Sequence, residues 1–139
     1  MKTIVVGYDA TEPSERALER AAQLGEAFGA KLVVTSVAPA GATGPRGMGP
    51  IDPTDSPEEH HAELVKAHEY LSGRNVAAEY QPAIGHEADS IIEVAEATSA
   101  DLIVIGTREP GMLARLFGTS VSESVQRRAH CDVLIVHAN

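Results

Sequence analysis

Short apolar runs alternate with longer segments of helical period along the chain. The runs are rich in β-branched residues and are expected to be strands at Thr3 to Tyr8, Lys31 to Val37, Val76 to Pro82, Leu102 to Ile105 and Val133 to His137. The first, fourth and fifth runs are nearly unbroken, a pattern typical of strands that are covered on both faces. Because strands alternate with helices, the pattern predicts crossover connections and an α/β fold with a parallel sheet.

Four segments between these runs repeat apolar residues at helical spacing. The first is expected to be capped by Thr11, and the second to run from about Ser56 to Leu71. The third is expected to begin near His86 or Glu87, and the fourth at Ser120, where Ser-Val-Ser-Glu fits a capping box. The residues expected to share one stripe of each helix are, in turn, Ala17, Ala21, Leu24 and Phe28; His61, Leu64, His68 and Leu71; Ile91, Ile92 and Ala95; and Val121, Val125 and Ala129.

The segment from about residue 39 to residue 56 breaks this pattern, because glycine and proline are interleaved along it. Such a composition does not pack into a regular element and predicts a flexible loop. A lid over a binding site is one interpretation, and an exposed connection is favoured over it by the usual lengths of loops. The remainder of residues 1–139 is expected to form one domain.

Composition and charge narrow the range of partners. The chain has 139 residues, of which 43% are hydrophobic, and a formal net charge of −9. This charge repels nucleic acid and anionic membrane surfaces at long range. No apolar stretch approaches the roughly 18 residues of a membrane span, and no secretory leader is visible before Ile4. A single cysteine, Cys131, is incompatible with an internal disulfide, so a cytoplasmic protein is expected.

Open parallel sheets bind ligands at the carboxyl ends of their strands, so the residues just after each run are the first candidates for a binding site. Asp9 follows the first run, where a carboxylate can accept from a ribose hydroxyl or help hold a divalent cation. An aspartate that only forms the turn before a helix explains the position equally well.

A glycine-containing turn from Gly106 leads from the fourth run to the helix that begins near Ser120. Backbone N–H groups and a helix N-terminus favour an anion at such a turn, and phosphate is the natural candidate. The Walker and dinucleotide glycine patterns are absent, and a simple helix cap remains an alternative. The sequence places no pair of carboxylates and no catalytic triad together. A third possible function, an enzyme such as a slow nucleotide hydrolase, would therefore lack a general base.

Several stretches together resemble the universal stress protein family over essentially the whole chain. These stretches are Ile4 to Asp9, Glu12 to Leu18, Gly85, Ala100 to Arg108, Ser120 to Ser122, and Cys131 to Val136. The resemblance implies a single-domain sheet of five parallel strands in the order 3-2-1-4-5 with helices on both faces, and a homodimer formed through the last strand. It also implies a crevice between the first and fourth strands that binds an adenine nucleotide.

The resemblance implies a role for particular residues of this crevice. Asp9 matches the aspartate on the ribose or metal side, which makes Mg²⁺ a possible cofactor, and the backbone of Val37 matches the group that reads adenine. The family pattern G-x2-G-x9-G-[ST] begins at Gly106, and its last hydroxyl is that of Ser120. Together with Asp9 and Val37, the residues predicted to bind the nucleotide are Gly106, Arg108, Gly118, Thr119, Ser120, Val121 and Ser122.

Two of the three glycines of that pattern are absent, since Glu109 and Thr119 stand in their places. A carboxylate 4 Å from a phosphate charge costs about 1 kcal/mol in water and about 4 kcal/mol at an effective dielectric constant of 20. Thr119 is strained by on the order of 1–3 kcal/mol if its position needs positive φ, and Gly118 can take over that conformation. A ligand with fewer phosphates than ATP, such as AMP or cyclic AMP, is expected to suffer less. The alternative is a dimeric interaction module that binds no nucleotide.

Overall fold

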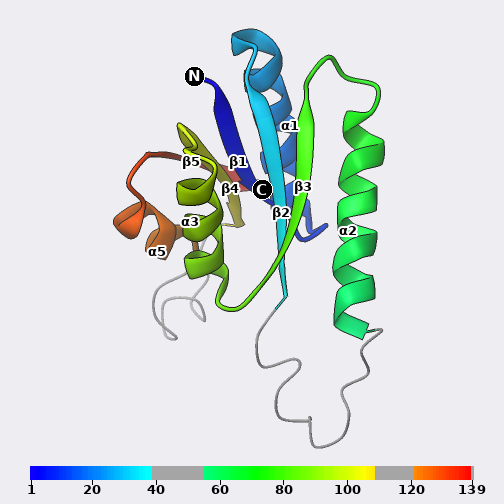
Figure 1. Cartoon of the computed structure of the whole chain (residues 1–139), viewed down its shortest axis with the longest axis vertical. Coiled ribbons are helices and arrows are strands. Elements are labelled where there is room, and N and C mark those ends of the chain that lie inside the picture. The colour runs from blue at the N-terminus through cyan, green and yellow to red at the C-terminus, as the bar shows by residue number, and fades with distance from the viewer. Residues whose placement is uncertain (39–54, 109–120, 139) are drawn as a thin grey trace, which may run out of the picture.

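A computed structural model describes residues 1–38, 55–108 and 121–138, in which five strands and four helices alternate (Figure 1). The strands are β1 (Thr3–Gly7), β2 (Lys31–Ala38), β3 (Ala78–Ile84), β4 (Leu102–Arg108) and β5 (Asp132–Ala138). The helices are α1 (Glu12–Phe28), α2 (Asp55–Leu71), α3 (Glu87–Ala97) and α5 (Val121–Arg128).

All five strands are parallel and lie in the order β3-β2-β1-β4-β5, which confirms the predicted sheet. From β1 the chain builds outward through β2 to β3, and it then crosses back so that β4 pairs with the other side of β1. The direction of winding therefore reverses between β1 and β4. Such a reversal is where open sheets of this kind bind ligands.

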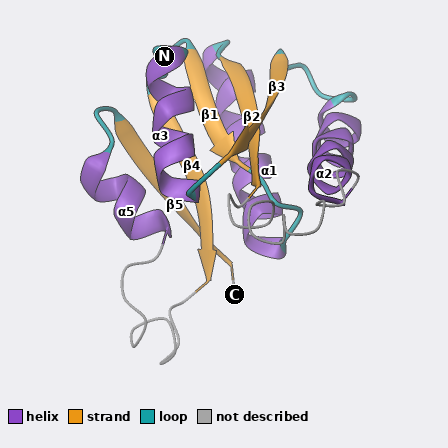
Figure 2. Cartoon of the chain, turned by 60° about the horizontal axis from the view of Figure 1, so that its bottom comes forward, coloured by secondary structure: helices purple, strands orange, loops and turns teal. Residues whose placement is uncertain are grey.

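Helices cover both faces of the sheet (Figure 2). On one face, α1 and α2 pack against side chains such as Ile4, Val6 and Val34. On the other face, α3 and α5 pack against the alternate side chains, including Val5 and Ile103. The central strands are thus buried on both sides, which explains their unbroken apolar sequences.

The expected apolar stripe of α1 is wrong at its last residue. Ala17 and Ala21 are fully buried, whereas Phe28 is 59% exposed. The helix ends beyond the first residues of the strands, as Figure 1 shows, and Gly29, in the left-handed conformation at φ 67°, turns the chain back. The last turn therefore has no strand to pack against, although helical periodicity alone places Phe28 on the buried face.

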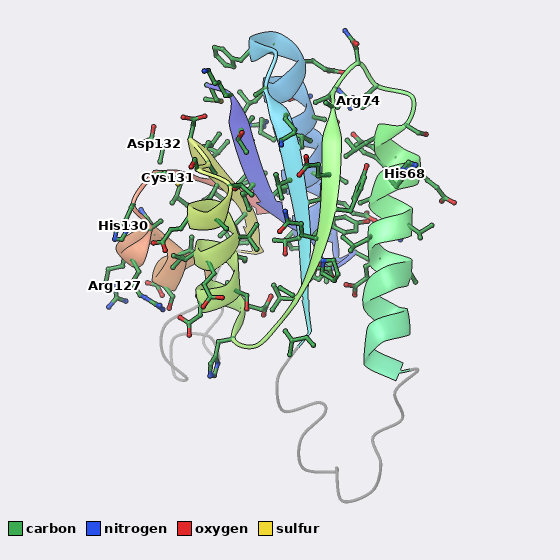
Figure 3. All side chains as sticks on the ribbon, in the orientation of Figure 1. His68, Arg74, Arg127, His130, Cys131 and Asp132 are labelled. Carbon is green, nitrogen blue, oxygen red and sulfur yellow. The ribbon has the colours of Figure 1, made fainter. Side chains whose placement is uncertain are left out.

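The expected stripe of α2 is also partly wrong. Leu64, Ala67 and Leu71 are buried, whereas His68 is exposed (Figure 3). The imidazole of His68 meets the edge strand β3 instead, with its ring 5.4 Å from that of Tyr80 in an edge-on arrangement. His61, expected on the same stripe, belongs to the part of α2 whose side chains lie outside the described residues.

The two edge strands differ from the expectation. Strand β3 begins at Ala78 rather than Val76 and carries Pro82 within it. Strand β5 has an apolar sequence, yet Val133 to Ile135 are only partly buried, because the strand has a neighbour on one side alone. Its continuous apolar run therefore does not reflect burial on both faces.

The predicted loop lies almost entirely outside the described residues, and only its last two positions, 55 and 56, are seen, in the first turn of α2. Helix α5 begins at Val121, and Glu123 lies in its first turn as a capping box requires. Ser120, the predicted cap, is not among the described residues.

Candidate functional site

The carboxyl ends of β1, β2 and β4 form the frame of the candidate site. Strand β1 pairs with β4 only as far as Val6 and Val104, and with β2 as far as Gly7 and Thr35. Both neighbours continue after β1 has ended, β2 to Ala38 and β4 to Arg108. The end of β1 is therefore the position at which the crevice implied by the resemblance is expected.

Asp9 lies at this edge in a tightly bonded turn. Its carboxylate oxygen Oδ1 accepts hydrogen bonds from the backbone N–H of Thr11 at 3.0 Å and from the Thr11 hydroxyl at 2.5 Å. The Asp9 backbone N–H donates to the hydroxyl of Ser14 at 3.1 Å. Among the described residues, Oδ2 takes part in no hydrogen bond. Asp9 thus forms the turn, as one of the two sequence interpretations holds, and can still offer one oxygen to a ligand.

Ala10 adopts a left-handed backbone conformation, with φ 64°, within the same turn. A residue with a Cβ atom pays on the order of 1–3 kcal/mol for a sparsely populated conformation and keeps it only where its surroundings impose it. The methyl group of Ala10 packs against the apolar core beneath α1, which fixes the turn from below.

Val37, which the resemblance matches to the residue that reads adenine, lies in the part of β2 that extends beyond β1. The carbonyl oxygen of Thr35 accepts from the N–H of Tyr8 at 2.9 Å, so the backbone groups of Thr35 face β1. Because these groups alternate along a strand, the N–H and C=O of Val37 face the same side, beyond the last pair with β1. The side chain of Val37 packs under α3, which leaves the backbone as the part of the residue directed toward the crevice.

Gly106 lies directly against the first turn of α1. A Cβ atom at Gly106 would come within 1.9 Å of the carbonyl oxygen of Pro13 and 2.3 Å of its carbonyl carbon. Only glycine permits this contact between two backbone segments. The contact brings the turn that holds Asp9 next to the start of the predicted phosphate loop, and it gives Gly106 a structural role that sequence reasoning missed.

The rest of the predicted phosphate loop is described only at its ends. Thr107 and Arg108 continue β4, and the Arg108 side chain lies outside the description, as do Gly118, Thr119 and Ser120. Val121 begins α5, and Ser122 is buried in its first turn. The end of β4 at Arg108 and the start of α5 at Val121 lie at the same edge of the sheet as Asp9, because each helix returns the chain to the amino ends of the strands.

An ion pair fixes α5 against α3 beside this edge. The Arg128 guanidinium donates a hydrogen bond to the Asp89 carboxylate, and this bond together with the charge of Arg128 holds the pKa of Asp89 below its usual value. An open hollow of about 380 Å³ lies between the N-terminal turns of the two helices, next to Val121 and Ser124. Two helix N-termini, which favour anions, thus border this hollow together with the carboxylates of Glu87 and Asp89, which oppose them.

A polar cluster lies beneath the site, on the α1 and α2 side of the sheet. Tyr8 is 4% exposed, and its hydroxyl is hydrogen-bonded to Glu15. The Ser36 hydroxyl donates to Glu63 of α2 at 2.5 Å. Burial, followed by the nearby carboxylates of Glu15, Glu63 and Asp9, raises the pKa of Tyr8 to about 12. Tyr8 therefore stays neutral at physiological pH.

Ser14 is the residue of the site that the sequence analysis did not single out. It is 6% exposed and occupies the first turn of α1, three positions after the cap residue Thr11. A hydroxyl at that spacing from a capping threonine is the sequence signal that could have identified it.

In the described ranges, no three His, Cys, Asp or Glu side chains are grouped so that they could hold a metal ion. None of the helices seen in residues 1–38, 55–108 and 121–138 has the length and apolar character needed to cross a bilayer.

Comparison with known proteins extends over nearly the whole chain. The model of the universal stress protein family matches residues 1–137. A universal stress protein of Mycobacterium tuberculosis is 36% identical over 98% of this chain and 96% of its own length. Its counterpart in Methanocaldococcus jannaschii is 31% identical over 97% of this chain and 81% of its own.

Solved structures agree with this result. The crystal structure of a universal stress protein in complex with cAMP has a TM-score of 0.77 and 29% sequence identity, and the match covers 99% of this chain and 98% of that one. The crystal structure of the Mycobacterium tuberculosis protein has a TM-score of 0.64 and 34% identity, with 99% of this chain and 96% of that one covered.

Proposed function

Since the chain belongs to the universal stress protein family, we propose that it is a cytoplasmic regulatory protein that binds an adenine nucleotide in the crevice at the end of β1. The observation that carries the proposal is the arrangement of three groups at one edge of the sheet. The Asp9 turn, the outward backbone of Val37 and the start of the loop at Gly106 border the point where the winding reverses. The related structure that holds cAMP supports the same ligand class.

Each group has a task in the proposed complex. Asp9 accepts from a ribose hydroxyl through Oδ2, since Oδ1 already accepts two hydrogen bonds from Thr11. The N–H and C=O of Val37 bond the edge of the adenine ring. The phosphate lies toward the N-terminus of α5, where the positive end of the helix dipole and the hydroxyls of Ser120 and Ser122 favour an anion.

The nucleotide in this proposal is AMP or cyclic AMP in preference to ATP. Glu109 stands where the family pattern has a glycine, and its charge opposes each additional phosphate. In our proposal, Arg108 offsets this charge for a single phosphate with or without Mg²⁺, and Gly118 takes over the backbone conformation of the glycine that Thr119 replaces. Hydrolysis is not expected, because no base is assigned in the crevice.

Isothermal titration of AMP, cyclic AMP and ATP, each with and without Mg²⁺, tests the proposal. We expect AMP and cyclic AMP to bind more tightly than ATP by on the order of tenfold, which corresponds to about 1.4 kcal/mol of charge repulsion. GMP serves as the matched control for the recognition of adenine. The variant Asp9→Ala tests the role of the carboxylate, and Glu93→Ala, on the exposed side of α3, is its matched control. Absence of heat and of a thermal shift at millimolar AMP and cyclic AMP would remove the nucleotide from the function.

A second candidate function, a dimeric interaction module without a ligand, is favoured by the replacement of two motif glycines by Glu109 and Thr119. The double variant Glu109→Gly/Thr119→Gly separates the two candidates. Nucleotide binding that appears only in the double variant would indicate that the natural loop has lost this function. With either candidate function, we propose that the homodimer forms through β5. The central residues of this strand, Val133 to Val136, are apolar, and the strand carries neither proline nor lysine.

A further inference from the structure

The turn between β1 and α1 contains a closed ring of hydrogen bonds. The Thr11 hydroxyl donates to Asp9 Oδ1 at 2.5 Å and accepts from the Ser14 N–H at 3.5 Å. The Ser14 hydroxyl donates to the Thr11 carbonyl oxygen at 3.0 Å and accepts from the Asp9 N–H at 3.1 Å. A longer bond of 3.4 Å joins the Thr11 hydroxyl to that of Ser14. Each hydroxyl therefore acts as both donor and acceptor, and the two together hold both the backbone and the carboxylate of Asp9.

Burial differs sharply within this ring. Asp9 and Thr11 are exposed, whereas Ser14 is 6% exposed and belongs to the first turn of a helix that is packed on the sheet. The rigid part of the ring is thus Ser14, and the part directed toward solvent is the carboxylate. An exposed acidic side chain otherwise samples several rotamers, and fixing it before a ligand arrives reduces the entropy lost on binding.

Two further features connect this ring to the crevice. Ala10, with φ 64°, lies inside it and keeps its left-handed conformation only if the neighbouring residues hold it. Pro13, the neighbour of Ser14, touches Gly106 on the opposite side of the crevice. The first turn of α1 therefore sets the position of Asp9 relative to the start of the phosphate loop.

From this geometry we infer that Ser14 and Thr11 are positioning residues for ligand binding, which orient Asp9 Oδ2 toward a ribose hydroxyl of the nucleotide. The inference rests on the proposed function and adds residues that act through Asp9. Ser14 contributes through the Asp9 backbone, and Thr11 through the carboxylate oxygen Oδ1.

The test is a double-mutant cycle read by isothermal titration with AMP and cyclic AMP. Loss of one positioning hydrogen bond in Ser14→Ala is expected to weaken binding roughly 3- to 10-fold. Thr11→Val is expected to weaken it to a similar extent, while Thr11→Ser retains the hydroxyl and should bind as the wild type does. In an Asp9→Ala background, Ser14→Ala should cause no additional loss.

A control variant and a second readout keep the outcomes separate. Thr98→Ala removes a comparable bond, from the Thr98 hydroxyl to the Val94 carbonyl oxygen at 2.7 Å, at the end of α3 away from the crevice. It should change thermal stability without changing affinity. Amide hydrogen exchange at Asp9, followed by NMR without ligand, should be faster in Ser14→Ala than in the wild type.

Equal losses of affinity for Ser14→Ala in the wild-type and Asp9→Ala backgrounds would overturn the inference, since Ser14 would then act independently of Asp9. Unchanged exchange at the Asp9 amide would also overturn it. If the wild type binds neither nucleotide, the proposed function fails instead, and amide exchange still decides whether Ser14 holds the turn.

Discussion

At the scale of single residues, Gly106 and Tyr8 show how closely the core approaches the crevice. Gly106 ends the buried part of β4 in direct contact with the backbone of Pro13. Tyr8 directly follows β1 and is buried, with its hydroxyl among carboxylates. Both residues precede a proposed ligand contact, so a change at either one affects the fold as well as the crevice.

Gly106→Ala is expected to destabilise the protein by roughly 1–3 kcal/mol, because the added methyl group overlaps a backbone carbonyl that cannot rotate away. Urea denaturation measures the change. Gly73→Ala is the matched control, since a Cβ atom at Gly73 meets nothing within 4 Å, and its effect should stay within about 0.5 kcal/mol. Equal stability of the two variants would contradict the close contact between Pro13 and Gly106.

Tyr8 is expected to ionise near pH 12, above the ordinary phenol value of 10.0, chiefly because it is buried and then because of the nearby Glu15. Tyrosinate absorbance, followed against pH, should show the ionisation of Tyr8 as a step near pH 12, and Tyr8→Phe should remove this step. The raised pKa contributes stability that is fully present below pH 10.0 and lost as the pH rises through about 12. A wild-type titration that is complete by pH 11 would contradict this assignment.

At the scale of elements, hydrogen bonds at the amino edge hold β1 in register with its neighbours. The Asp101 carboxylate, just before β4, accepts from the backbone N–H groups of Lys2 at 2.7 Å and Thr3 at 3.0 Å. The Asp101 N–H in turn donates to the Thr3 carbonyl oxygen at 2.9 Å. The hydrogen bonds to its carboxylate lower the pKa of Asp101, and the bond from the Lys2 N–H has the largest effect.

Asp101→Asn should therefore lower the thermal midpoint most at neutral pH. A lowered carboxyl pKa contributes stability that is present above the unfolded value and lost as the pH falls through the folded one. Thermal melts from pH 7 to pH 3 should show the difference between variant and wild type shrinking toward acid. Glu93→Gln, at an exposed carboxylate of α3, is the control. A difference that is the same at pH 3 and pH 7 would argue against the bonded carboxylate.

The sequence predicted the elements well where local chemistry determines them. Thr11 caps α1 as expected, and the strand order agrees with the resemblance. The predicted helix stripes were wrong at Phe28 and His68, which are exposed. Helical periodicity does not show where the underlying sheet ends or which side chain meets an edge strand. The contact of Gly106 with Pro13 joins segments far apart in the sequence and has no local signal. The sequence located Asp9, Val37 and Gly106, and the ligand roles of the nine site residues stay predictions.

At the scale of the whole molecule, the two edges of the sheet differ in chemistry. Strand β3 carries Pro82, which lacks a backbone N–H, and its end at Ile84 is 68% exposed. Strand β5 has an apolar run, and its residue Ile135 is partly buried but belongs to neither core cluster. Pairing with a second chain is therefore easier at β5 than at β3.

Ile135→Lys is expected to convert the proposed dimer to a monomer, because a charge at an apolar strand edge opposes pairing. Analytical ultracentrifugation should show the mass fall from twice 14.6 kDa to 14.6 kDa. Ile84→Lys makes the same change near the other edge and should leave the mass unaltered. Dissociation by Ile84→Lys but not by Ile135→Lys would place the interface elsewhere.

The difference between the two edges also bears on aggregation. A sheet that could pair at both edges would add molecules without limit and grow into a fibre. Here Pro82 removes a backbone donor from β3, so a pair formed through β5 would present a proline-bearing strand at each outer edge. We therefore expect concentrated solutions of this protein to contain finite assemblies, and replacement of Pro82 by a residue with an N–H to be the change that most readily permits fibrils.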